Sequence, residues 1–405
     1  MTTVTATMNQ LSDRVNKMYE SATIKMSKAS RALKAQGIDI VDLSLGEPDF
    51  DTPQHIKDAA KVAIDKGFTK YTPVAGTPEL RKAISAKFKR DNNLEYSPDH
   101  IVVSTGAKQS IANVILSLIN PGDEVLLPVP YWVSYSAVTD LAEGKCIEVP
   151  AGIETNFKIT AAQLEQNITP KTKLIIFSSP CNPTGSVYNY AELAAMAKVI
   201  KKHPNVFVMC DEIYEYINFT GERHYSLAEF TDIKDQVITV NGFSKGFAMT
   251  GWRLGYIGAP LLISKACEKM QGQITSGTCS ISQKAGEAAL LADLAPTHKM
   301  VEAFKKRRDI VYAFLKDIPG LKVNLPDGAF YFFPDVSAYL GKSFNGNVIN
   351  TPEELCLLLL SEAKVATVGG ESFGDKNCIR LSYATSEEKL IEAGKRLKEG
   401  FAKLK

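Results

Sequence analysis

The sequence has no apolar run long enough to cross a membrane. Its apolar runs, such as Leu357 to Leu360, are far shorter than the roughly 20 residues that a membrane-spanning helix needs. The first residues, MTTVTATMNQLSDRVNK, also lack the apolar centre of a secretion signal. We therefore expect a cytoplasmic protein.

An excess of charge of either sign is also missing. The 405 residues include 47 Lys and Arg against 45 Asp and Glu, which gives a formal net charge of +2 at pH 7. This balance argues against nucleic acid or an anionic membrane as the main partner. At roughly 150 residues per domain, the length predicts a globular protein of two or three folding units.

Paired cysteines and nucleotide-binding motifs are absent as well. The seven cysteines are scattered and never form C-x-x-C, so we expect reduced thiols rather than disulfides or a zinc site, and no bound metal. Neither G-x-G-x-x-G nor G-x-x-x-x-G-K-[ST] occurs. Their absence argues against a nicotinamide dehydrogenase and against a P-loop enzyme.

The sequence does contain β-branched runs that alternate with helix-like stretches, such as the one from Lys108 to Ile119. This alternation predicts an α/β fold with a mostly parallel sheet flanked by helices. The six candidate strands run from His100 to Thr105, Glu124 to Pro130, Lys173 to Pro180, Asn205 to Glu212, Gln236 to Ser244 and Arg253 to Ala259.

After about Ala295 the sequence changes to long charged helices and short strands, a texture that predicts a smaller α+β domain. We expect this domain to be built from both chain ends. The expected division is an N-terminal segment of the small domain at 1–48, a large domain at 49–295 and the small C-terminal domain at 296–405.

Polar side chains follow the predicted strands. Because ligands of open α/β sheets bind beyond the carboxyl ends of the parallel strands, these side chains are expected to converge on one edge. In chain order they read Gly106-Ala107-Lys108, Tyr131-Trp132, Asn182-Pro183-Thr184-Gly185, Asp211-Glu212-Ile213-Tyr214, Ser244-Lys245 and Trp252-Arg253.

Seven strings in one order carry a resemblance to a known family. They are SLGEPDFDTP, KYTPVAGTPELR, PYWVSY, NPTG, DEIYE, SKGFAMTGWRLG and IRLSYATS, spread from about Ser44 to Ser386. In these strings the chain resembles the fold-type I aminotransferases that use pyridoxal phosphate, most closely the bacterial aspartate aminotransferase subgroup. The resemblance covers nearly the whole chain and implies a sheet of the seven-stranded type.

Lys245 resembles the lysine that binds the cofactor covalently. This role needs an amine that forms a Schiff base and then carries a proton between the substrate α-carbon and the cofactor. Sequence order alone explains Lys245 equally well as a solvated surface lysine, whereas the string SKGFAMTGWRLG favours the catalytic role.

Three further residues resemble partners of the cofactor ring. Asp211 is similar to the carboxylate that keeps the pyridine nitrogen protonated, with a helix N-cap as the alternative. Tyr214 and Asn182 resemble the donors to the phenolic oxygen. Core packing of Tyr214 and a turn at Asn182 are the alternatives.

The resemblance also implies a stacking ring and a phosphate site. Trp132 is similar to the aromatic residue stacked on the cofactor, although simple burial is the commoner use of Trp. Arg253 would hold the phosphate together with the backbone of Gly106 and Ala107 at a helix N-terminus.

One residue departs from the family. Many relatives carry a hydroxyl residue three positions before the cofactor lysine, where this chain has Gly242. Either the phosphate has one donor fewer, or Ser244 or a backbone group supplies the missing hydrogen bond.

For the substrate, Arg380 resembles the arginine that binds the α-carboxylate, because its planar fork matches that group. The backbone of Gly46 would be its partner over the substrate. Lys108, with Ser21 and Thr23, would recognise a second carboxylate, although a solvated lysine at a helix start is the alternative.

Tyr71, in KYTPVAG, resembles the tyrosine that reaches the phosphate of the neighbouring subunit. The alternative is a tyrosine beside a turn. If the resemblance holds, the protein is a homodimer with shared active sites.

We therefore predict an aminotransferase that moves the amino group of L-aspartate to 2-oxoglutarate by a ping-pong mechanism with pyridoxal 5′-phosphate. The rivals are a prephenate, aromatic or alanine aminotransferase, or a lyase of the same fold. A non-enzymatic regulator with an aminotransferase-like domain is the rival of another class.

Overall fold

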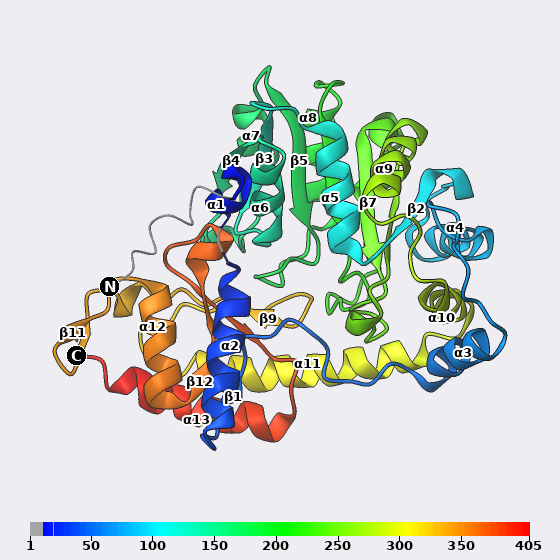
Figure 1. Cartoon of the computed structure of the whole chain (residues 1–405). Coiled ribbons are helices and arrows are strands. Elements are labelled where there is room, and N and C mark those ends of the chain that lie inside the picture. Colours follow the sequence, from blue (N-terminus) through cyan, green and yellow to red (C-terminus); the bar gives the residue numbers. More distant parts are fainter. Residues whose placement is uncertain (1–10, 19) are drawn as a thin grey trace.

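The structure is a computed structural model that describes residues 11–18 and 20–405 (Figure 1). The start of the predicted 1–48 segment and most of the stretch expected to contain no secretion signal lie outside the described residues. Among the described residues, no helix combines the length and the apolar character required to cross a membrane.

A seven-stranded sheet forms the centre of the larger part of the molecule, in the strand order β2-β8-β7-β6-β5-β3-β4. All neighbouring pairs are parallel except those of β8, which runs antiparallel to β2 and β7. The predicted mostly parallel sheet is therefore confirmed. Its strands are β2 Ile101–Ser104, β3 Glu124–Val129, β4 Lys145–Pro150, β5 Thr172–Ser178, β6 Phe207–Asp211, β7 Val237–Gly242 and β8 Gly255–Gly258.

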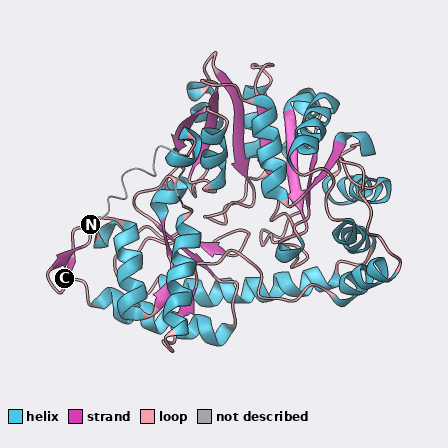
Figure 2. Cartoon of the chain, viewed as in Figure 1, coloured by secondary structure: helices cyan, strands magenta, loops and turns pink. Residues whose placement is uncertain are grey.

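Helices cover both faces of this sheet (Figure 2). Alternate side chains of one strand enter different cores: Val102 packs with the helices of one face and Val103 with those of the other. Burial on both faces explains why these strands, apart from the edge strand β4, are almost continuously apolar. The helices are α5 Ala107–Leu118, α6 Ser134–Leu141 and α9 Leu261–Ile274 on one face, and α3 Gln54–Asp65, α4 Pro78–Asn92, α7 Ala161–Asn167, α8 Tyr190–Ile200 and α10 Ser280–Leu291 on the other.

A second core joins the N-terminal segment to the last hundred residues. In Figure 1 the blue α2 lies beside the orange and red elements, and β1 pairs in parallel with β12. The long helix α11 runs beneath both parts of the molecule. The elements are α2 Ala22–Ala35, β1 Val41–Asp42, α11 Ala295–Leu315, β9 Tyr331–Phe332, β10 Ser343–Phe344, β11 Asn347–Val348, α12 Pro352–Leu358, β12 Val365–Ala366, β13 Val368–Gly369, β14 Ile379–Ser382 and α13 Glu387–Ala402. The short α1 Asp13–Lys17 buries no residue and lies against the larger part, where Arg14 pairs with Glu143 after α6.

The helix α11 shows how the sequence builds this second core. Its buried residues Met300, Phe304, Val311 and Leu315 recur at helical spacing, so one stripe faces the core. The apolar residues of 26–43 pack on the same core. A small part built from both chain ends is thus observed, while the exact boundaries at residues 48 and 295 stay predictions.

Candidate active site

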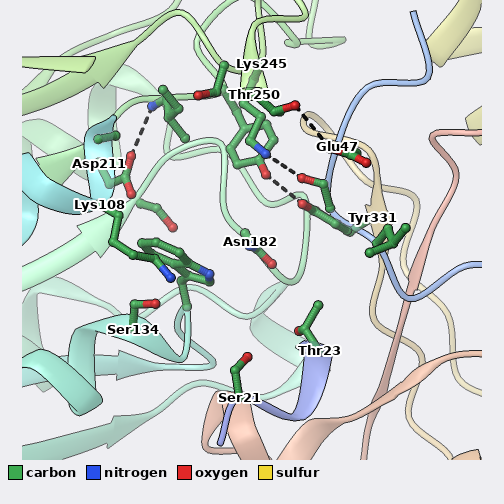
Figure 3. Close-up of a pocket in the computed structure, with 18 of the residues that line it drawn as sticks. Ser21, Thr23, Glu47, Lys108, Ser134, Asn182, Asp211, Lys245, Thr250 and Tyr331 are labelled. Atoms are coloured by element: carbon green, nitrogen blue, oxygen red, sulfur yellow. Dashed lines mark hydrogen bonds between the residues drawn. The ribbon is translucent and has the colours of Figure 1, made fainter. Parts of the chain in front are cut away.

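A cavity of about 390 Å³ lies at the carboxyl edge of the sheet, where Figure 3 shows side chains converging from both parts of the molecule. Five strands, β2, β3, β5, β6 and β7, end toward it, and the antiparallel β8 begins there. Most residues predicted for the site line this cavity: Ser21, Thr23, Gly46, Ala107, Lys108, Trp132, Asn182, Asp211, Tyr214, Ser244, Lys245, Arg253 and Arg380.

Lys245 follows β7, and its Nζ donates a hydrogen bond to the carbonyl oxygen of Gly46. Burial lowers the pKa of this amine to about 8, with Arg380 and Arg253 acting in the same direction and Glu47 and Asp211 opposing them. A lysine with this pKa is partly neutral near pH 8 and can act as a nucleophile or as a base.

Asp211 is the last residue of β6, and its side chain is buried. Its Oδ2 accepts a hydrogen bond of 2.7 Å from the hydroxyl of Tyr135, and its Oδ1 accepts one of 3.2 Å from the backbone N–H of Ile213. Burial raises the pKa of this carboxyl to about 6, although both hydrogen bonds lower it. The positive charge of Lys245 also lowers it but does not compensate the burial fully.

Tyr214 lies opposite Tyr331, which comes from β9 in the second core. The two hydroxyls are 2.7 Å apart and buried. Burial raises the pKa of Tyr214 well above its usual range, and the neighbouring Tyr331 adds to this shift. Tyr214 is therefore a neutral donor near neutral pH.

Arg380, on β14, is fully enclosed. Its guanidinium donates to Asn182 Oδ1 at 3.0 Å and to the carbonyl oxygen of Ser44 at 2.7 Å, and it lies 4.7 Å from the ring centre of Tyr331. Its Nε is buried without a hydrogen-bond partner. Burial lowers the pKa of this side chain, so a bound anion would compensate its desolvation.

Lys108 begins α5 at the mouth of the cavity, and its Nζ lies 4.9 Å from the ring centre of Trp132. Partial burial and the nearby Arg253 lower its pKa. In Figure 3, Ser21 and Thr23 lie across the cavity from Lys108. The mouth thus offers one cation and two hydroxyls to a polar ligand.

The predicted phosphate end is formed by Arg253 and the start of α5. A Cβ on Gly106 would lie 2.5 Å from Nη2 of Arg253, and φ at Gly106 is +84°, so only glycine fits. The N–H of Gly106 donates to the carbonyl oxygen of Ser104. Gly106 therefore provides space, while the N–H of Ala107 points out of the helix start as a donor.

The glycine that departs from the family has a steric reason. A Cβ on Gly242 would lie 2.9 Å from the Cα of Gly255 on β8, so a hydroxyl side chain has no room there. Ser244 does line the cavity.

Tyr71 lies outside the cavity of its own chain, and 98% of its surface is exposed. It precedes α4, and the neighbouring Thr72 is tied to the carbonyl oxygen of Thr278 before α10. Within residues 11–18 and 20–405, no group of three or more His, Cys, Asp or Glu side chains is placed to hold a metal ion.

Sequence reasoning missed several residues of the cavity, among them Tyr135, Tyr331 and Glu47. Tyr135 lies in the string PYWVSY, in the first turn of α6, and its ring contacts that of Trp132 just before the helix. Tyr331 follows the turn at Asp327-Gly328, but nothing near it in sequence points to the site. Glu47 accepts a hydrogen bond of 3.1 Å from Thr250 across the cavity, although it stands in the quoted string SLGEPDFDTP.

Comparison with known proteins gives one consistent result. The family described as aminotransferase class I and II matches residues 38–397. The chain is 47% identical over 399 residues to a bifunctional aspartate aminotransferase and glutamate/aspartate-prephenate aminotransferase of Petunia hybrida, covering 98% of this chain and 83% of the petunia chain. It is 46% identical to a probable aspartate/prephenate aminotransferase of Rickettsia bellii, covering 98% of this chain and all of the other.

Solved structures agree. The aspartate aminotransferase of Rhizobium meliloti superposes with a TM-score of 0.94 at 42% identity and covers 98% of this chain and 100% of its own. The Thermus thermophilus aspartate aminotransferase with maleate gives a TM-score of 0.91 at 39% identity and covers 97% of this chain and 100% of its own.

Proposed function

The chain belongs to the class I and II aminotransferases, and we propose that it transfers the amino group of L-aspartate to 2-oxoglutarate in a ping-pong reaction with pyridoxal 5′-phosphate. The observation that carries this proposal is one cavity lined by a partly buried amine, a buried carboxylate and a buried guanidinium, those of Lys245, Asp211 and Arg380. Each of these groups lacks a full counter-charge in the protein itself.

The residues fit this cofactor. Asp211 is buried, and the attraction of Lys245 offsets only part of its burial, which suits a protonated ring nitrogen. Tyr214 and the amide nitrogen of Asn182 would donate to the phenolic oxygen, and Trp132 would stack on the ring. Arg253, with the N–H of Ala107, Ser244 and the space left at Gly106, would hold the phosphate.

When bound, pyridoxal phosphate supplies an electron-withdrawing ring that stabilises negative charge at the substrate α-carbon. The protein's own residues supply position and proton transfer. Arg380 binds the α-carboxylate by its fork and so orients the C–H bond. Lys245 Nζ takes the proton from the substrate α-carbon, holds it and gives it up again later in the transfer. A pKa of about 8 permits both proton transfers near neutral pH.

The mouth of the cavity supports a dicarboxylic substrate. Lys108 offers a cation there, and Ser21 and Thr23 add hydroxyls. The names of the relatives include both aspartate and prephenate, each of which carries two carboxylates, so prephenate stays the second candidate.

We also propose a homodimer with shared sites in a reducing, cytoplasmic compartment. The fully exposed Tyr71, the exposed Phe68 after α3, and the exposed side chains of Ile64 and Leu291 on the packed helices α3 and α10 support an interface there. All seven cysteines are free, which suits a reducing compartment.

A donor panel tests the substrate. Purified protein is assayed with aspartate, glutamate, alanine, phenylalanine and prephenate-derived pairs, and we expect aspartate with 2-oxoglutarate to be fastest. Lys108→Met should raise KM for aspartate by about 10- to 100-fold while leaving alanine unaffected, because only aspartate carries the second carboxylate.

Lys245→Ala should abolish turnover, and the surface variant Lys265→Ala serves as the matched control. A Lys245→Ala enzyme with wild-type rates would refute the mechanism. A Lys108→Met enzyme unchanged toward aspartate would refute the dicarboxylate site.

A further inference from the structure

The segment 211–217 begins at Asp211, the last residue of β6, continues without regular secondary structure and carries two proposed cofactor ligands. It consists of two overlapping turns, in which the N–H of Glu215 donates to the carbonyl oxygen of Glu212 at 2.9 Å and that of Ile217 to Tyr214 at 2.8 Å. The side chains of this segment that line the cavity are Asp211, Ile213 and Tyr214. Its two glutamates bond instead to groups on the far side.

Glu215 is held by a buried polar cluster on α4. It forms an ion pair with Lys87, and its Oε2 accepts a 2.7 Å hydrogen bond from Asn92. Lys87 Nζ also donates to Asn92 Oδ1 at 2.6 Å, so the three side chains close a triangle. The side chains of Lys87 and Glu215 are 0% and 3% exposed.

A second anchor holds the same segment. Ser226 donates a 2.6 Å hydrogen bond to Glu212 Oε1, and His224 Nε2 lies 3.2 Å from Glu212 Oε2. Tyr216 donates to Asp91 of α4 at 2.6 Å. The segment is thus fixed by polar contacts on the side opposite the cavity.

A buried ion pair is a poor source of stability, because the cost of removing two charges from water cancels much of their attraction. Apolar residues of the same size would often hold a core equally well. Apolar contacts have no preferred direction, so they would not hold the backbone in one position as charge-assisted hydrogen bonds do. Stability alone therefore does not explain why a charged cluster is buried at this place.

We propose that Glu215, held by Lys87 and Asn92, is a positioning residue that fixes Asp211 and Tyr214 for their work on the cofactor. This inference rests on the proposed function, since those two side chains are assigned to the cofactor ring there. Glu215 acts through the backbone between it and the ligands and does not itself line the cavity.

The test compares single and double variants of the full chain. Glu215→Gln leaves Lys87 buried without its charge partner, and Lys87→Met with Glu215→Gln removes both charges. We expect the single variant to lower Tm and the double variant to recover most of that loss. Leu397→Ala, on the buried face of α13, is the control for destabilisation away from the segment.

The first readout is the pH midpoint of the absorption change of bound pyridoxal phosphate. When the contacts from Asp211 and Tyr214 weaken, Nζ of Lys245 keeps its proton more readily in the cofactor-loaded protein. The midpoint should therefore rise by about one pH unit in both Glu215 variants. Leu397→Ala should leave it unchanged. A double variant with recovered Tm and a wild-type midpoint would overturn the inference.

The second readout is hydrogen–deuterium exchange of cofactor-free protein. Amides of residues 211–217 should exchange at least about tenfold faster in the double variant, with the rest of the sheet unchanged. Unchanged exchange in this segment overturns the inference by itself. If wild-type protein shows no cofactor band, the proposed function fails, while the exchange experiment still decides whether the ion pair fixes the segment.

Discussion

Burial lowers the pKa of the Lys245 amine, while nearby positive and negative side chains act on it in opposite directions. With a pKa of about 8 rather than 10.5, its neutral fraction rises steeply through mildly alkaline pH. We expect the rate at which cofactor-free protein takes up pyridoxal phosphate to increase between about pH 7 and about pH 8 and to level off above about pH 9. A rate that keeps rising toward pH 10 would show an ordinary lysine. Stopped-flow absorbance measures it.

The buried negative charge of Asp211 lowers the stability of the folded, cofactor-free protein. Its folded-state pKa of about 6 lies above the value of 3.8 in the unfolded chain, so the folded protein binds more protons in this window and loses stability as the pH rises through it. Asp211→Asn keeps an acceptor for Tyr135 but removes the charge. We expect it to stabilise cofactor-free protein by up to about 3 kcal/mol at pH 8 and to have no effect near pH 4.

Thermal unfolding of the cofactor-free protein and of the asparagine variant at both pH values measures this difference. A variant that is less stable than wild type at pH 8 would contradict the assigned burial cost. Activity should be lost in the variant in either case, since the charge serves the cofactor.

Residues inside the matched strings could be predicted from sequence, because type and context together define Lys245, Asp211 and Arg380. Tyr331 could not, since its role depends on two cores meeting: it lies on β9 of the second core, and its hydroxyl meets Tyr214 after β6 only in the folded chain. The same holds for Lys87, which lies far from Glu215 in sequence and meets it only in the fold.

Among the elements, the buried strands were predictable because burial on both faces makes them continuously apolar. The strand β4 was not predicted, since it pairs only with β3 at the sheet edge and alternates between exposed residues such as Glu148 and buried ones such as Val149. The antiparallel direction of β8 has no local signal either, yet it brings Arg253 to the same edge as the carboxyl ends of its neighbours.

Close packing of β8 against the start of α5 shapes the phosphate end. A Cβ on Gly255 would lie 2.3 Å from the nitrogen of Ala107. We expect Gly255→Ala to push that N–H out of place and to weaken cofactor binding by about 10- to 100-fold, the value of one hydrogen bond to a charged group. Gly251→Ala, which meets no atom within 4 Å, should bind normally.

Fluorescence or absorbance titration of cofactor into both cofactor-free variants provides the comparison. Equal affinities for the two alanine variants would remove the start of α5 from the phosphate site.

At the scale of the whole molecule, Tyr71 is fully exposed and lies outside the cavity of its own chain. If it completes the partner's site, Tyr71→Ala and Lys245→Ala chains complement each other, because a mixed dimer contains one site with both residues intact. We expect coexpressed, doubly tagged mixed dimers to recover about half of the wild-type activity. Activity no higher than that of the separate variants would contradict a shared site.

The overall architecture followed from the order of motifs along nearly the entire chain, and the match over residues 38–397 confirms the predicted family. Pairing of β1 with β12 was not visible in the sequence, because two-residue strands have no periodicity. Domain boundaries are hard to predict for a different reason, because the long α11 runs beneath both parts rather than ending at a linker.

The most direct test of the central claim is the near-ultraviolet and visible absorption spectrum of the purified protein, recorded before and after L-aspartate and then 2-oxoglutarate. The account predicts a cofactor band that converts to the pyridoxamine form with aspartate and returns with 2-oxoglutarate, since Arg380 and Lys108 would hold both dicarboxylates. A band that ignores aspartate but responds to another amino acid would contradict the dicarboxylate assignment. No band, even with added pyridoxal phosphate, would contradict the whole account.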